Sequence, residues 1–173
     1  MTEFVLAGGC FWCLDSSYMQ FRGVTDVVVG YMGGHVENPS YEQVCEKTTG
    51  HAEVAKVIFD ETVISADTIL DIFFTLHNPT TPGRQGDDIG PQYRSAMFYA
   101  SEEQRAAFEA ARDRAVELWD APIVTEIVPA STFWVGEEYH QDFFAKNPLQ
   151  GYCNAVVAPK MAKVRAKFAQ FAR

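Results

Sequence analysis

The stretch FVLAGGCFWC (residues 4–13) decides how the chain begins to fold, because its pattern changes at two adjacent glycines. The apolar run before the glycines predicts a short strand over residues 3–7. The glycines allow a tight turn, and a helix is expected over residues 10–20. Cys10 would then lie at a helix N-terminus, where free N–H groups and the helix dipole stabilise a thiolate. We expect Cys10 to be a reactive thiol with a lowered pKa; the alternative is a buried structural cysteine.

Strand and helix patterns alternate along the rest of the chain, without repeats, low-complexity tracts or linkers. Residues 78–95 lack periodicity and are rich in turn formers, which predicts an ordered, functional loop. The mixed order predicts one α/β (α+β) two-layer domain over residues 1–173, with residues 146–173 as a C-terminal tail that carries a basic helix. The other strands are expected at 24–31, 51–60, 96–99 and 123–128, and the helices at 38–47, 65–77, 101–119, 137–145 and 160–171.

Composition excludes several classes of partner. The chain has 173 residues, of which 47% are hydrophobic, so it can bury a sizeable core. Its formal net charge of −9 argues against nucleic acid or an anionic membrane as a partner. No targeting signal is present, and no apolar run approaches the ~18 residues of a membrane span, so we expect a soluble, cytoplasmic protein. Four cysteines in that compartment indicate catalytic, redox or metal chemistry rather than structural disulfides.

Cys13 completes a C-x-x-C pattern with Cys10. In a cytosolic chain this spacing is typical of a redox pair, because residues i and i+3 share a helix face. Zinc is the competing interpretation and would need two more ligands, for which Cys45, His35 and His51 are the nearest candidates. No second C-x-x-C or closely paired histidine follows, so we expect no metal.

Glu53 is notable because of strand parity. In the expected strand over residues 51–60, Glu53 shares a face with Ala55, Val57 and Phe59. A carboxyl on an apolar face is desolvated, so its pKa rises and it can serve as a general acid. The alternative, left open by the sequence, is that Glu53 reaches water at the strand end.

Seven motifs occur in order over residues 8–153, and together they resemble the A-type peptide methionine sulfoxide reductases. The resemblance covers nearly the whole chain and implies a ferredoxin-like sandwich with a mixed sheet and long wrapping loops. The motifs are GGCFWC, GYMGG, NPSYEQVC, TGHAEV, RQGDDIGPQYRS, EEYHQDF and NPLQGYC.

The resemblance implies reduction of the S epimer of methionine sulfoxide, free or in proteins. Cys10 would be the nucleophile and Glu53 the proton donor to the sulfoxide oxygen. Attack would give methionine and a sulfenic acid on Cys10, which condenses with a second thiol. Cys153 would be the resolving cysteine, with Cys13 as a fallback or relay. No cofactor would be bound, and thioredoxin or another dithiol would reduce the disulfide.

The resemblance also assigns binding roles. Tyr41 and Tyr93 would hydrogen-bond the sulfoxide oxygen, and Asp88 matches a polar residue of the family's site. Phe11 and Trp12 would line the pocket for the S-methyl group. From spacing alone, each of these residues could equally belong to the core, its rim or a turn.

Two departures from the family pattern stand out. Cys13 replaces a common glycine, and Asp87 replaces a common asparagine, adding a negative charge near the site. Cys45 has no assigned role, and we interpret it as structural. Two other functions stay open at this stage: a general thiol–disulfide oxidoreductase that uses Cys10 and Cys13, and a zinc-binding module.

Overall fold

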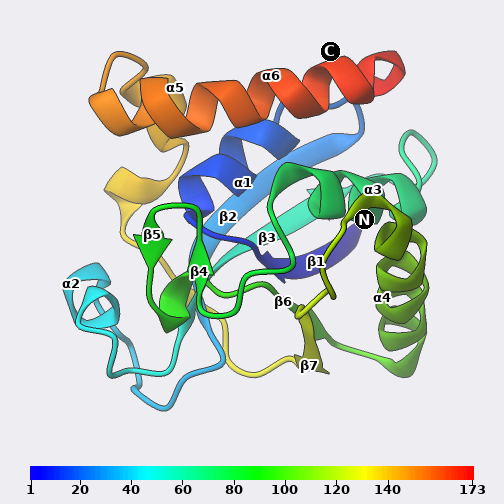
Figure 1. The fold of residues 1–173 in the computed structure, drawn as a ribbon. Helices are drawn as coiled ribbons and strands as arrows, with labels where there is room; N and C mark the ends of the chain where they lie inside the picture. The colour runs from blue at the N-terminus through cyan, green and yellow to red at the C-terminus, as the bar shows by residue number, and fades with distance from the viewer.

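A mixed six-stranded sheet forms the centre of the computed structural model, which describes residues 1–173 (Figure 1). The strand order is β7-β6-β1-β3-β2-β8, and only the β6–β7 pair is parallel. The strands are β1 (Thr2–Ala7), β2 (Val24–Met32), β3 (Ala52–Phe59), β6 (Ala96–Tyr99), β7 (Glu126–Pro129) and β8 (Trp134–Val135).

The predicted ferredoxin-like sandwich is confirmed by the order of the first elements. Apart from a short helix over 41–45 and short elements over 84–93, they run β1-α1-β2-β3-α3-β6, and the four strands lie in the order β6-β1-β3-β2. Helices α1 (Phe11–Tyr18) and α3 (Ala66–Leu76) share the main core with one face of the sheet. A smaller apolar cluster covers the other face, around Met32, Val54 and Phe98.

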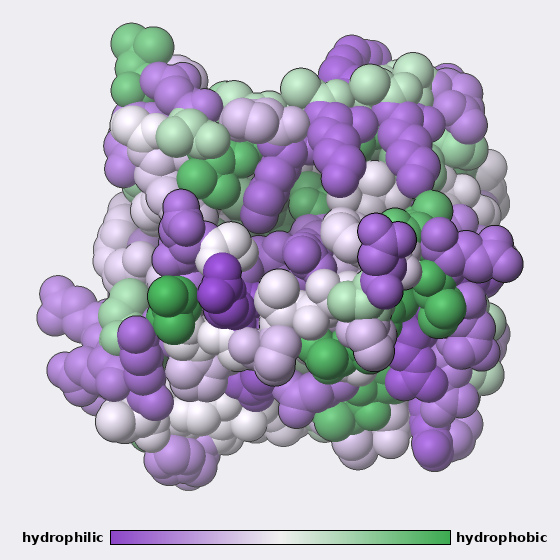
Figure 2. All heavy atoms as spheres, in the orientation of Figure 1, coloured by the Kyte–Doolittle hydropathy of each residue, from purple (hydrophilic) through white to green (hydrophobic).

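The C-terminal tail packs on the helical layer. A π-helical turn over Cys153–Val157 leads into α6 (Ala158–Lys167), which contacts both α1 and α3 and lies across the top of Figure 1. Hydrophilic side chains alternate with pale green, weakly hydrophobic ones along the exposed side of this helix in Figure 2. An isolated β-bridge between Phe21 and Ala172 holds the C-terminal end of the chain against the rest of the fold. No helix combines the length and the apolar character that crossing a bilayer would require.

Two further helices follow strands β2 and β6 in the chain. Helix α2 (Tyr41–Cys45) begins with a capping box formed by Ser40 and Gln43, and α4 (Glu102–Ala115) lies beside α3. The remaining elements are β4 (Arg84–Gln85), β5 (Asp88–Ile89), η1 (Pro91–Tyr93), η3 (Glu138–His140) and α5 (Phe143–Lys146).

The sequence misplaced several boundaries. The strand expected over 123–128 is β7, which begins at Glu126, where pairing with β6 begins. The helix expected to reach residue 119 is α-helical only to Ala115 and then tightens into a 3₁₀ turn. The loop over 78–95 contains the β4–β5 hairpin, and the terminal helical segment already begins at Gly151.

The edge of the sheet at β2 is closed by a segment that the sequence did not predict as strand. Strand β8 pairs with Gly30 and Tyr31, and a Cβ on Gly30 would collide with the Trp134 carbonyl oxygen. Beyond β8, the amide side chain of Gln141 accepts from the N–H of Val29 at 2.9 Å and donates to its C=O at 3.0 Å. One side chain therefore continues the ladder of β8.

Candidate active site

Cys10 is the N-cap residue of α1, as the strand–turn–helix pattern predicted. Gly9 precedes it with a φ of 90°, a left-handed conformation that favours glycine. The Cys10 side chain does not cap the helix, and the residue is 7% exposed. The tight turn therefore places the thiol at the free N–H end of α1, inside the molecule.

Glu53 is the buried acid that strand parity predicted. The residue is 1% exposed, its Oε1 accepts a 3.1 Å hydrogen bond from the N–H of Phe11, and its Oε2 has no partner. Burial raises the pKa of Glu53 to about 8, and the negative charge of Asp88 adds to this, while the Phe11 bond opposes it. The prediction of a raised pKa is confirmed, and the alternative of a water-exposed carboxyl is wrong.

The lowered pKa expected for Cys10 is wrong for this closed site. Burial raises the pKa of the Cys10 thiol well above its usual value, and the charges of Glu53 and Cys13 raise it further. The backbone N–H of Trp12 and the nearby Tyr152 hydroxyl act in the opposite direction. Desolvation outweighs these donors, because little water reaches the sulfur to solvate a thiolate.

Phe11 and Trp12 lie at the same end of α1 within an aromatic cluster. The Phe11 ring is 5.7 Å from Tyr31 and 6.4 Å from Tyr41, centre to centre. The Trp12 indole stacks on Phe143 at 3.8 Å with an interplanar angle of 5°. The two predicted wall residues are thus both next to Cys10, and each is fixed by aromatic neighbours.

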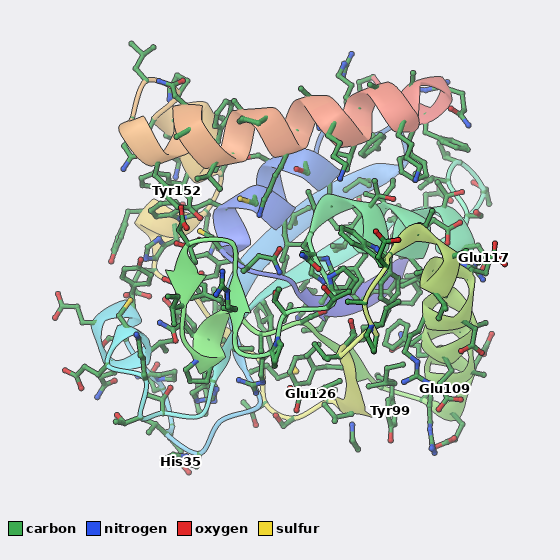
Figure 3. The ribbon with its side chains drawn as sticks, in the orientation of Figure 1. His35, Tyr99, Glu109, Glu117, Glu126 and Tyr152 are labelled. Atoms are coloured by element: carbon green, nitrogen blue, oxygen red, sulfur yellow. The ribbon has the colours of Figure 1, made fainter.

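The structure brings Tyr41, Tyr93 and Asp88 to Glu53 and the thiols. Burial raises the pKa of both tyrosine hydroxyls, and the charge of Glu53 raises each further. Asp88 accepts a 2.5 Å hydrogen bond from the Tyr152 hydroxyl, and Figure 3 shows Tyr152 between the β4–β5 hairpin and the helices above it. Tyr41, Tyr93 and Asp88 therefore all lie near the Glu53 carboxyl.

All four cysteines are free thiols, and Cys10, Cys13 and Cys153 belong to the main apolar core cluster. Burial raises the pKa of Cys13 to about 11, and the neighbouring thiols of Cys10 and Cys153 are coupled to it electrostatically. Burial also raises the pKa of Cys153, which is fully buried in its π-helical turn. Cys45 is half-buried at the end of α2; burial raises its pKa, and the nearby Tyr41 hydroxyl opposes this.

Other candidates from the sequence occupy structural positions. The two ring nitrogens of His51 bond the N–H of Gly34 at 3.0 Å and the C=O of Val36 at 2.7 Å, so the ring fastens a loop. Asp87 is exposed, in contrast to its neighbour Asp88. No group of three His, Cys, Asp or Glu side chains is arranged to hold a metal ion.

Sequence reasoning missed three residues of the site: Glu137, His140 and Tyr152. Glu137 accepts from the Tyr31 hydroxyl through Oε1 and from the N–H of Tyr41 through Oε2, both at 2.9 Å. His140 accepts from the indole N–H of Trp12 at 3.0 Å. These residues lie in the motifs EEYHQDF and NPLQGYC, which were the sequence features that could have indicated them.

Three neighbouring thiols and a buried acid on an α/β sandwich define a thiol-dependent oxidoreductase. The sequence profile described as "Peptide methionine sulfoxide reductase" matches residues 2–172. The chain belongs to the peptide methionine sulfoxide reductase family, as its motifs indicated.

Individual relatives agree with the family match. Over 173 residues the chain is 60% identical to peptide methionine sulfoxide reductase MsrA of Clavibacter michiganensis subsp. michiganensis, covering 100% of this chain and 99% of the relative. It is 57% identical to the MsrA of Paenarthrobacter aurescens, covering 95% of each.

Solved structures give the same result for the fold. Mxr1 from Saccharomyces cerevisiae in reduced form superposes with a TM-score of 0.83 at 34% identity, over 88% of each chain. Methionine sulfoxide reductase A of Corynebacterium diphtheriae gives a TM-score of 0.77 at 32% identity, over 88% of this chain and 77% of the other.

Proposed function

We propose that this chain reduces the S epimer of methionine sulfoxide, free or in proteins, with Cys10 as the nucleophile and Glu53 as the acid. The observation that carries the proposal is the free Oε2 of Glu53, a buried carboxyl oxygen without a partner at the N-terminus of α1. A carboxyl with a pKa of about 8 holds its proton at neutral pH. A sulfoxide sulfur becomes a good electrophile only when its oxygen receives such a proton.

The reaction uses a proton from Glu53 and the sulfur of Cys10. Glu53 protonates the sulfoxide oxygen while the Cys10 sulfur attacks the sulfoxide sulfur and forms a sulfur–sulfur bond, and the thiol proton passes to the same oxygen. The sulfur–oxygen bond of the substrate breaks and the oxygen leaves as water. A water molecule then attacks the Cys10 sulfur and returns one proton to Glu53, the sulfur–sulfur bond breaks, methionine leaves, and Cys10 becomes a sulfenic acid. Because ionised Glu53 raises the pKa of Cys10, a protonated Glu53 also favours the thiolate.

The residues around Glu53 bind the substrate. Tyr41 and Tyr93 stay protonated because burial raises their pKa, so both can donate hydrogen bonds to the sulfoxide oxygen. Phe11 and Trp12 form the wall against the S-methyl group. Burial raises the pKa of Glu53, and the charge of Asp88 adds to this effect.

A second thiol completes the cycle. Cys153 attacks the sulfenic acid on Cys10, which releases water and forms a disulfide, and Cys13 acts as a fallback or relay. Cys13 lies in the first turn of α1 after Cys10 and belongs to the same apolar core cluster as Cys153, which supports a relay position. Thioredoxin or another dithiol then reduces the disulfide, without a bound cofactor. Mxr1 from yeast has been solved in complex with Trx2, which supports such a partner.

These roles fit a cytoplasmic enzyme of protein repair under oxidative stress. The chemistry restores methionine side chains, and the reduced state of the cytoplasm supplies dithiols.

One experiment tests the reaction. Fully reduced protein is mixed with excess S-epimer methionine sulfoxide without reductant, methionine is counted, and disulfides are mapped by mass spectrometry. We expect about one methionine per chain and a disulfide that includes Cys10. Cys10→Ser is the control and gives none. If the wild-type protein gives no methionine and keeps all its thiols, the proposal is wrong.

A further inference from the structure

The motif EEYHQDF (residues 137–143) has no role in the chemistry above, yet its histidine lies inside the site. His140 is 1% exposed. Its ring centre is 4.4 Å from that of Tyr41 and 5.1 Å from that of Phe11. Its Nδ1 accepts the 3.0 Å hydrogen bond from Nε1 of Trp12. The histidine therefore touches both residues proposed as the methyl wall.

The bond to Trp12 determines where the imidazole carries its proton. An indole N–H can only donate, so Nδ1 must be an unprotonated acceptor, and the neutral ring carries its hydrogen on Nε2. Burial lowers the pKa of His140, which keeps the ring neutral. The Nε2 atom is buried without a partner. An arrangement that leaves one donor unpaired in order to bond Trp12 needs an explanation, and a functional role for the Trp12 bond supplies one.

The segment on both sides of His140 is anchored to the rest of the fold. Gln141 pairs with the backbone of Val29 on β2. The N–H of Asp142 donates a 2.7 Å hydrogen bond to Oδ2 of Asp15, one helical turn after Trp12. The next residue, Phe143, stacks on the indole. These contacts hold the histidine ring at a fixed place relative to α1.

The Trp12 indole is thus fixed in two ways. Phe143 covers one face of the ring, and stacking alone leaves the ring free to slide or turn in its plane. The hydrogen bond to His140 removes that freedom, because it fixes the edge that carries Nε1. A fixed indole gives the methyl wall one defined position.

We propose that His140 is a positioning residue that sets the orientation of the Trp12 indole and thereby the shape of the methyl site. The inference rests on the proposed function, in which Trp12 forms part of that wall. His140 acts through Trp12, so its removal should weaken substrate binding and leave the chemistry on Cys10 nearly intact.

Two substitutions separate the hydrogen bond from packing. His140→Asn places an amide oxygen near the position of Nδ1 and keeps an acceptor for the indole, whereas His140→Leu fills the space without one. We expect H140L to raise KM for methionine sulfoxide about tenfold with kcat within about twofold of wild type. H140N should restore KM to within about threefold of wild type. If H140N is as impaired as H140L, the inference is wrong.

The Trp12→Phe background tests whether the effect passes through Trp12. Phenylalanine has no N–H to orient, so H140L should add no further increase in KM to that of W12F. If the KM increases caused by H140L and W12F multiply in the double variant, His140 acts independently of Trp12 and the inference is wrong.

A spectroscopic measurement separates this inference from the proposed reaction. The indole N–H signal of Trp12, assigned by its loss in W12F, should shift in H140L and return in H140N. If the signal follows this pattern but no variant reduces methionine sulfoxide, the reaction is wrong and the positioning stands. If H140L leaves the signal unchanged, the positioning is wrong, whatever the activity.

Discussion

The backbone N–H of Phe11 donates a 3.1 Å hydrogen bond to Oε1 of Glu53, which joins the residue after the nucleophile to the buried acid. The bond uses one carboxyl oxygen and leaves Oε2 without a partner. The first turn of α1 and the strand β3 are therefore held in a fixed relation, and the buried Oε2 has no protein partner that a substrate would have to displace. The predictions below test what this pairing and its surroundings do.

Glu53→Gln should abolish most of the activity. Glutamine keeps an acceptor oxygen for the Phe11 N–H but has no proton to transfer to the sulfoxide. We expect the rate of methionine formation in a single turnover to fall by about 10²–10⁴. Thiol titration of the unfolded variant checks that all cysteines are intact. A rate within a few fold of wild type would remove Glu53 from the role of acid.

Asp88→Asn should shift the pH dependence of the same step. The charge of Asp88 contributes to the raised pKa of Glu53, which is about 8 in the wild type. The wild-type rate should fall as pH rises through about 8, since the acid is lost. In D88N this alkaline limb should move to lower pH, while asparagine still accepts from Tyr152. Asp87→Asn, at the exposed neighbouring position, is the matched control and should leave the limb in place.

Cys153→Ser should separate reduction from recycling. The variant still holds Cys10 and Glu53, so it should form about one methionine per chain, but turnover with thioredoxin should drop at least about tenfold. Mass spectrometry should then find a Cys10–Cys13 disulfide, formed against the strain of two sulfurs on one helical turn. Cys13→Ser should retain most of its turnover. If Cys13→Ser loses more turnover than Cys153→Ser, Cys13 is the resolving thiol.

Stability should fall as pH rises, because two buried carboxyls bind protons more tightly in the native state. Burial raises the pKa of Asp15 from 3.8 to about 7 and that of Glu53 from 4.5 to about 8. The stabilising contribution of each carboxyl is complete below its ordinary pKa, 3.8 for Asp15 and 4.5 for Glu53. It is lost as pH rises through the native-state pKa, which is about 7 for Asp15 and about 8 for Glu53. The slope should approach roughly 1 kcal/mol per pH unit for each group between these limits.

Urea denaturation at several pH values measures this slope. Asp15→Asn should flatten it and should raise the free energy of unfolding at high pH relative to wild type. The amide oxygen that this substitution introduces can still accept from the N–H of Asp142. Asp113→Asn, on the exposed side of α4, is the control. A slope identical in wild type and D15N would mean that Asp15 is already ionised in the native state near neutral pH.

Local patterns were enough to predict much of this molecule. The double glycine placed Cys10 at the start of α1, the parity of β3 placed Glu53 inside, and β6 has its predicted bounds of 96–99. Each of these follows from residues that are neighbours in the chain, so periodicity and turn chemistry suffice.

Contacts between distant segments were not predictable in the same way. The pKa of Cys10 depends on how completely the folded chain buries the thiol, and Tyr152 from the tail opposes that effect. Strand β8 has two residues, too few to show alternation. The role of His140 rests on a hydrogen bond across 128 positions in sequence. Such features arise only when the fold has brought the segments together.

The ladder that Gln141 continues on β2 has a consequence for how copies of the chain meet in a crowded cell. An open strand edge offers its N–H and C=O groups to any other extended chain and so invites intermolecular pairing and aggregation. At Val29 the amide side chain occupies both groups, immediately after the two residues of β8. The N–H of Gly136 also donates to the Val29 C=O, so a single glutamine and this backbone group extend the protected part of the β2 edge by one residue without another full strand.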